Sequence, residues 1–192
     1  EIGSLFLGLL STHEEIGYFK VAMQGSILIS IGIQAVNVVA GPQLSKIINK
    51  GGREETQKIL DKVVRISVFL SFPIFLFLFI ASEQIVVFLF GLEYEASAEL
   101  LRILSVGYMI NVICGPAGMM LNLSNLEKTT LKIQIFCLIT NILLLLILIP
   151  KYGSVGAAVA TAASLVLWNL ITTIQAYKLL NINTWFSLKE RV

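Results

Sequence analysis

Residues Val63–Ser82 read VVRISVFLSFPIFLFLFIAS, an apolar run whose length decides the fold. A bilayer core about 30 Å thick is crossed by about 20 helical residues, because each residue of an α-helix rises about 1.5 Å. Hydrocarbon offers no water to backbone amides, so such a run must satisfy its own hydrogen bonds as a helix. Four further runs are long enough to span: Tyr18–Gly41, Ala98–Leu121, Thr129–Ile149 and Val155–Leu180. The sequence therefore predicts an all-α, polytopic transmembrane bundle with five full spans.

The composition is typical of a membrane protein. Of the 192 residues, 56% are hydrophobic and 14% are charged, whereas soluble domains average about 45–50% and about 25%. This excess of apolar residues excludes a soluble enzyme and a nucleic-acid-binding protein. The two cysteines, Cys114 and Cys137, fall inside predicted spans, and His13 is the single histidine. We therefore expect no disulfide, no metal site and no cofactor.

The first residues suggest that more of the protein precedes them. The chain starts at Glu1 rather than at a methionine, and the apolar stretch Ile2–Leu10 is too short to cross a bilayer. We interpret this stretch as the end of a truncated helix, and the chain as the C-terminal part of a longer transporter. On this interpretation residues 1–182 form one transmembrane bundle and residues 183–192 form a cytoplasmic tail.

The basic residues predict an orientation in the membrane. Short cytoplasmic loops carry an excess of Lys and Arg. If the spans alternate in direction, Lys20, Arg102 and Lys151 fall on one side, and the other eleven of the 14 basic residues fall on the opposite side. We predict that the side with eleven, which includes the C-terminus, faces the cytoplasm in a cell inner membrane. Binding of anionic lipid or of a partner is an alternative role for these loops. The eleven residues are Lys46, Lys50, Arg53, Lys58, Lys62, Arg65, Lys128, Lys132, Lys178, Lys189 and Arg191.

Turn and charge patterns mark the limits of the spans. The pair Gly41-Pro42 is expected to end the first span. The sequence PKYG at Pro150–Gly153 predicts a tight turn, which makes the last two spans antiparallel neighbours. Favourably ordered i,i+4 charge pairs predict that the second span extends as an exposed helix across Arg53–Arg65. The run Ile85–Phe90 is too short to span and is expected to lie in the membrane interface.

One face of the first span is polar. Ser26, Ser30, Gln34 and Asn37 fall within an arc of about 80° at about 100° per residue, and the opposite face is Ile, Leu and Val. Amides are costly against lipid, so this face must meet another helix or a water-filled cavity. Helix packing, with hydrogen bonds worth about 0.6 kcal/mol each, and a cavity wall both remain open. Lys20, at the outer end of this span, could attract an anionic head group or extend to the interface.

The later spans carry fewer polar groups. Small residues recur every four positions in the last span, at Gly156, Ala160 and Ser164, which predicts close helix packing. In the third span Pro116 is expected to kink the helix, because proline removes one backbone donor. Acidic residues are absent from the middle of the predicted spans, so we expect no proton or sodium site in this part of the protein.

Three segments resemble parts of a known transporter family. The segment LLSTHEEIGYFKVA (Leu9–Ala22) is similar to the start of the C-terminal half of polysaccharide flippases. The segment LFGLEYEAS (Leu89–Ser97) is similar to the family's turn before a leucine-rich helix. Asn141, followed by LIPKYGSVGAAVAT (Leu148–Thr161), is similar to the family's Asn, LIP, YG and GAA pattern. The segments occur in the family's order and together extend over nearly the whole chain.

The chain therefore resembles the C-terminal half of an oligosaccharide flippase of the polysaccharide transporter family. This family belongs to the superfamily that also holds the multidrug and toxin extruders and the lipid II flippases. The resemblance implies two six-helix bundles around a central cavity, with the N-terminal half as partner of this chain. It also implies alternating access that carries an undecaprenyl-pyrophosphate-linked glycan from the inner to the outer leaflet for cell-surface polysaccharide biosynthesis. The implied cavity residues are Lys20, Ser26, Ser30, Gln34 and Asn37.

Two other functions remain open from the sequence. A cation-coupled multidrug extruder of the same superfamily would require an acidic residue in the cavity, and such a residue would have to come from the missing half. A membrane assembly subunit that transports nothing would pack the polar face of the first span against a partner helix. Translocation of a lipid-linked glycan makes and breaks no covalent bond, so we expect that the protein is not an enzyme.

Overall fold

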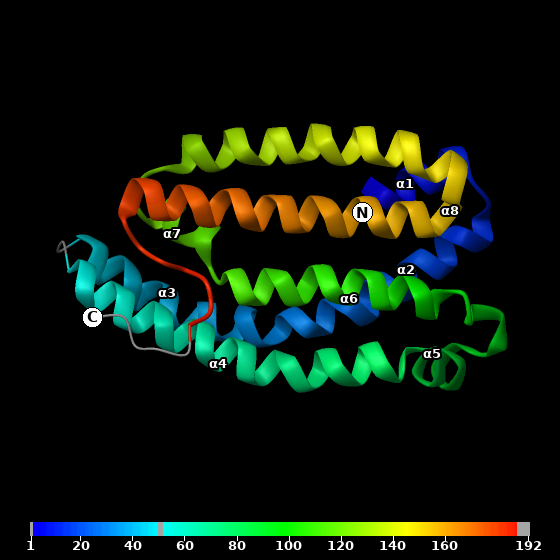
Figure 1. The fold of residues 1–192 in the computed structure, drawn as a ribbon, viewed down its shortest axis with the longest axis horizontal. Coiled ribbons are helices and arrows are strands. Elements are labelled where there is room, and N and C mark those ends of the chain that lie inside the picture. Colours follow the sequence, from blue (N-terminus) through cyan, green and yellow to red (C-terminus); the bar gives the residue numbers. More distant parts are fainter. Residues whose placement is uncertain (1, 50–51, 188–192) are drawn as a thin grey trace.

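The structure is a computed structural model that describes residues 2–49 and 52–187 (Figure 1). Within these ranges the chain folds into helices and contains no strand. Four helical segments are long and apolar enough to cross a bilayer: His13–Ile48, Arg53–Ile80, Ser97–Cys114 and Glu127–Leu180. The predicted all-α transmembrane bundle is confirmed, although the described residues give four such segments where five were expected.

The number of spans differs because the last two predicted spans form one bent element. Helix α8, Glu127–Leu180, contains 54 residues and reverses direction at Gly153, whose φ of 55° and ψ of −133° are not helical. Figure 1 shows its two arms side by side, the first yellow-green and the second orange. The arms approach closely at Gly156, because a Cβ atom there would overlap the backbone of Leu148. The predicted turn between antiparallel neighbours is therefore confirmed.

The first span is longer and less regular than expected. Helix α2, His13–Ile27, continues through a 3₁₀ turn, η1, Leu28–Ser30, into α3, Ile31–Asn49. The overwound turn follows Ser26 and ends at Ser30, and both hydroxyls donate to backbone carbonyls of their own helix. Hydroxyls that bond back in this way compete with the helical ladder and distort it.

The prediction that Gly41-Pro42 ends the first span is wrong for the helix, since Pro42 lies inside α3. A proline removes only one backbone donor, and α3 packs along α4, which supports the helix beyond it. Helix α4, Arg53–Ile80, begins where the charge pairs predict and continues through Pro73.

The third span is broken rather than kinked. Helix α6, Ser97–Cys114, ends at Gly115, whose φ of 69° lies in the left-handed region. Pro116 follows, and the short helix α7, Ala117–Leu123, starts after it. The sequence predicts a continuous helix to Leu121, but a left-handed glycine before a proline ends the helical ladder completely.

Three short elements complete the bundle. Helix α1, Ile2–Leu10, packs against α2 and α8. Helix α5, Ser82–Phe90, includes the run that was expected in the membrane interface, and its Phe88 side chain is 87% exposed. The 3₁₀ turn η2, Leu92–Tyr94, connects α5 to α6.

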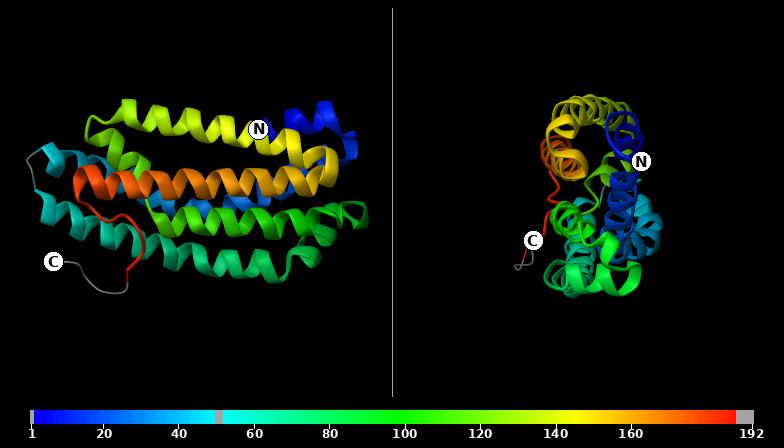
Figure 2. Two further views of the ribbon diagram at one scale, coloured as in Figure 1. Left: turned by 45° about the horizontal axis from the view of Figure 1, so that its top comes forward. Right: turned by 90° about the vertical axis from the view of Figure 1, so that its right-hand side faces the viewer.

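Helix α6 lies at the centre of the bundle. It contacts α2, α4, α5 and α8, and Figure 2 shows it between the α8 hairpin and α4. In its apolar stretch 56% of residues are buried, against 33%, 28% and 22% in the other three segments. The other segments therefore present most of their apolar side chains outward, as expected of helices that face lipid.

The charged connections collect at opposite ends of the bundle. The end of α3, the start of α4, the α7–α8 connection and the end of α8 lie at one end, here called the basic end (Figure 1). The α1–α2 turn, α5, η2 and the bend of α8 lie at the other, here called the acidic end. Of the basic residues assigned to the cytoplasmic side, Lys50, Lys189 and Arg191 lie outside the described residues.

At the acidic end the α1–α2 turn packs on the bend of α8. The Thr12 hydroxyl accepts the backbone N–H of Glu15 as a helix cap, and Ser11 donates to the Glu15 carboxylate. That carboxylate occupies the space that a side chain at Gly153 would need. The bend of α8 thus requires glycine for two reasons, its left-handed φ and the adjacent carboxylate.

We predict that Gly153→Ala destabilises the bundle. The left-handed backbone and the contact with Glu15 together should cost about 1–3 kcal/mol, and the melting temperature in nanodiscs should fall by about 3–10 °C. Gly8→Ala is the matched control, because only Ile16 approaches its Cβ position, at an ordinary 3.5 Å. Equal melting temperatures for the two variants would contradict this account of the bend.

Candidate substrate cavity

A polar cavity of about 590 Å³ lies at the break between α6 and α7, where α3 and both arms of α8 also meet. We call it the amide cavity, because four asparagines and one glutamine contribute to its wall. Its volume is within the range of about 300–1,000 Å³ typical of small-molecule sites. It is lined by Ser30, Ile33, Gln34, Asn37, Tyr108, Asn111, Gly115, Pro116, Gly118, Met119, Asn122, Leu123, Thr130, Trp168 and Asn169.

Side-chain NH₂ groups of the cavity wall bond within the protein. Gln34 Nε2 donates to Ser30 Oγ at 2.7 Å, one helical turn away. Asn111 Nδ2 donates to Asn169 Oδ1 at 2.9 Å, which links α6 to the second arm of α8. Asn169 Nδ2 in turn donates to the Leu165 carbonyl at 2.8 Å. These bonds fix the amide planes and use one of the two N–H donors of each of the three side chains.

The side-chain oxygens of Gln34, Asn37 and Asn111 remain available to accept hydrogen bonds. Asn37 Oδ1 is buried and accepts no hydrogen bond from the described residues. Within the same ranges, no bond reaches the side-chain oxygens of Gln34 and Asn111. An unsatisfied buried acceptor costs about 1–3 kcal/mol. The wall can therefore accept hydrogen bonds from the hydroxyl groups of a guest.

The broken backbone forms part of the same wall. Gly115 and Pro116 line the cavity directly. Irregular backbone at membrane depth is tolerated where it is covered by protein or lines a polar cavity. Gly118 lies in α7 and allows this helix to approach Trp168 closely, since a Cβ atom there would lie 3.3 Å from the Trp168 ring.

The structure brings three of the five predicted site residues together. Ser30, Gln34 and Asn37 line the amide cavity, and their role in binding remains a prediction. Ser26 does not line it, because its side chain is fully buried and donates to the Ala22 and Met23 carbonyls of its own helix.

Lys20 lies in a different place. It lines a groove of about 480 Å³ beside α1 and α2, together with Gln24 and apolar side chains that include Phe19 and Met23. The Lys20 side chain is exposed and forms no ion pair with any residue that the structure describes. We call this the lysine groove; it offers a positive charge apart from the amide cavity.

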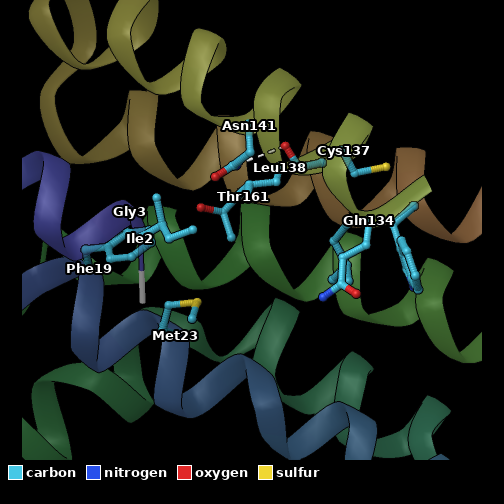
Figure 3. A pocket seen from close by; sticks show the side chains of 12 residues that line it. Ile2, Gly3, Phe19, Met23, Gln134, Cys137, Leu138, Asn141 and Thr161 are labelled. Carbon is cyan, nitrogen blue, oxygen red and sulfur yellow. Dashed lines mark hydrogen bonds between the residues drawn. The ribbon is translucent and has the colours of Figure 1, made fainter. Parts of the chain in front are cut away.

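A third, smaller pocket of about 290 Å³ lies between α1, α2 and the arms of α8 (Figure 3). Asn141 Nδ2 donates to Ser164 Oγ at 2.9 Å and to the Ala160 carbonyl at 3.2 Å. Asn141 therefore ties the two arms of α8 together. The amide of Gln134 points into this pocket in Figure 3, and Trp168 lines both this pocket and the amide cavity.

Several wall residues were not candidates from the sequence. Asn122, Thr130, Tyr108 and Trp168 come from three different segments, and no single helical stripe includes them. The available signal was the Gly115-Pro116 break itself, because unwound backbone in a membrane helix needs polar surroundings.

The comparisons with known proteins decide the family. Residues 1–99, about half of the chain, match the family model described as polysaccharide biosynthesis protein. The chain belongs to this family. Its apolar helices make it a membrane protein, in agreement with the printed names of its relatives.

Three relatives of this family member carry descriptions. The probable low-salt glycan biosynthesis flippase Agl15 of Haloferax volcanii is 26% identical over 82% of this chain and 34% of its own length. The membrane protein MJ1068 of Methanocaldococcus jannaschii is 27% identical over 83% and 33%. The probable flippase AglR of Haloferax volcanii is 24% identical over 88% and 36%. The chain thus spans about one third of the length of each of these relatives.

We predict that the amide cavity is wet. With Cys114 and Cys137 replaced by Ala, Gln34→Cys should react with a membrane-impermeant thiol reagent in nanodiscs. Val39→Cys is the control, because Val39 is 68% exposed but lies about 140° around the same helix, where lipid is expected. It should react at least tenfold more slowly. Equal rates at the two positions would show that the cavity side of α3 is no wetter than its lipid side.

Proposed function

We propose that this protein is part of a membrane flippase that moves a lipid-linked oligosaccharide between bilayer leaflets. The family membership and the flippase descriptions of two relatives support a role in glycan biosynthesis. In this proposal the glycan occupies a polar space inside the protein while its lipid tail stays in the bilayer. No covalent bond changes, so the process is transport rather than catalysis.

The unpaired amide oxygens of the cavity carry this proposal. A sugar hydroxyl donates one hydrogen bond, and the oxygens of Gln34, Asn37 and Asn111 can accept such bonds. A phosphate carries negative charge, and no positively charged side chain among the described residues lines the cavity to balance it. Among residues 2–49 and 52–187, no Asp, Glu, Lys or Arg lines the cavity. These features favour neutral, hydroxyl-rich groups over charged ones.

The lysine groove offers a place for the anionic part of such a substrate. Lys20 projects an ammonium group at the α1–α2 surface, apart from the amides. An ammonium group is a common partner for phosphate. We propose that a pyrophosphate passes Lys20 while sugars contact the amide cavity. A second bundle in the same transporter would close the opposite side of this path, and the two would alternate between inward-open and outward-open forms.

The alternatives have less support in this chain. A cation-coupled extruder needs a carboxylate in its cavity, and no carboxylate of the part of the chain that the structure describes lines the amide cavity. An assembly subunit would satisfy the unpaired Asn37 Oδ1 by packing against a helix of another chain. Both alternatives leave the flippase descriptions of the relatives unexplained.

We predict that the double variant Gln34→Leu, Asn37→Leu abolishes glycan export in a deletion strain complemented with the complete gene. Two leucines remove two acceptors, each worth about 1–1.5 kcal/mol to a bound hydroxyl, so the rate should fall at least tenfold. Surface glycan at equal membrane expression is the measurement.

The control is Gln43→Leu, the same substitution at an exposed glutamine of α3 outside the cavity. It should leave export unchanged. Normal export in the double variant would remove the amide cavity from the mechanism. Loss of export in both would point to α3 folding instead of substrate contact.

A further inference from the structure

The segment after α8 folds back across the bundle instead of leaving it. We call residues 181–187 the strap. It starts at Asn181, a left-handed residue that caps α8, and in Figure 1 it is the red segment that runs from the end of α8 toward α4 and α6. Residues 183–192 are expected from the sequence to form a cytoplasmic tail, and the described part of that segment, residues 183–187, lies against the bundle.

Two side chains of α4 hold the strap. Arg53 donates to the Asn181 carbonyl through Nε at 3.1 Å and through Nη2 at 2.7 Å. Gln57 bonds to both backbone groups of Asn183, donating to its carbonyl and accepting from its N–H, each at 2.9 Å. Gln57 Nε2 also donates to Asp61 Oδ1 at 2.8 Å, which fixes the plane of its amide.

The strap completes the break between α6 and α7. The Phe186 N–H donates to the Ile113 carbonyl at 2.8 Å, so it satisfies one carbonyl that the end of α6 leaves without a helical partner. The Thr184 carbonyl lies in the space that a side chain at Gly115 would need. Ile182 is buried in a cluster with Leu60 and Met120. The strap thus covers Gly115 on one side, and the amide cavity lies on the other.

We propose that the strap sets the shape of the amide cavity and that Gln57 is its positioning residue. Gln57 is absent from the residues that line the cavity and acts through Asn183 and the strap on Gly115. Its two bonds to Asn183 fix the position of the strap along α4. The strap in turn holds the backbone conformation at Gly115-Pro116, which forms part of the cavity wall. The role of the strap in transport rests on the proposed flippase activity. Its effect on the conformation of Gly115 does not.

The two native cysteines test the coupling. Both are buried; Cys114 ends α6 directly before Gly115, and Cys137 lies in the first arm of α8. In nanodiscs containing the product of the complete gene, Gln57→Leu should raise the N-ethylmaleimide reaction rate of Cys114 about tenfold, which corresponds to about 1.4 kcal/mol in the opening equilibrium. Arg53→Ala should raise it by about threefold. Cys137 should change less than twofold, as measured by mass spectrometry of the labelled peptides.

Gln43→Leu is the matched control and should leave both cysteines protected. If neither Gln57→Leu nor Arg53→Ala changes the Cys114 rate, the strap does not position the break. If Cys114 and Cys137 become reactive together and the melting temperature falls, Gln57 has only a general structural role, which also overturns the proposal. Glycan export should fall in Gln57→Leu. Absence of export in the unmodified protein would refute the proposed function and leave the labelling result standing.

Discussion

Hydrocarbon offers no hydrogen bonds to the backbone, and this constraint governs every irregular feature of the bundle. The helices satisfy it internally along most of their length. At Gly115 the third span loses its helical ladder, and the protein must supply other partners there. The strap supplies one on one side through Phe186, and a polar cavity occupies the other side. The strap and the polar cavity thus both surround the backbone that is left without helical hydrogen bonds where α6 ends.

The chemistry of the cavity follows from how its amides are used. Each amide brings a donor group and an acceptor oxygen. Bonds between neighbouring helices and within single helices consume donors, as in the pair Asn111 and Asn169. The oxygens and N–H groups left over give the wall hydrogen-bonding capacity from uncharged side chains. A membrane protein can hold such a surface at lower cost than a buried carboxylate, because no ion has to be desolvated.

Much of the fold was accessible from the sequence, because a spanning helix needs only length and apolarity. The runs around Val63–Ser82 and the PKYG turn gave the spans and the α8 hairpin. Helical periodicity also placed Ser30, Gln34 and Asn37 on one face. Periodicity fixes an angle around one helix but not the partner across from it, so Asn122 and Trp168 could not be found. Ser26 shares the angle of the stripe, yet its hydroxyl bonds to its own helix, which no pattern distinguishes.

The contact of Glu15 with Gly153 joins the beginning of the chain to a bend far along it. Ribosomes deliver these two segments to the membrane at different times. The pair of helices α1 and α2 therefore lacks this contact until the bend of α8 has been synthesised. The strap follows α8 in the chain, so its bonds to Arg53 and Gln57 form later still, and the contacts at the basic end are the last of the two sets to be completed during synthesis.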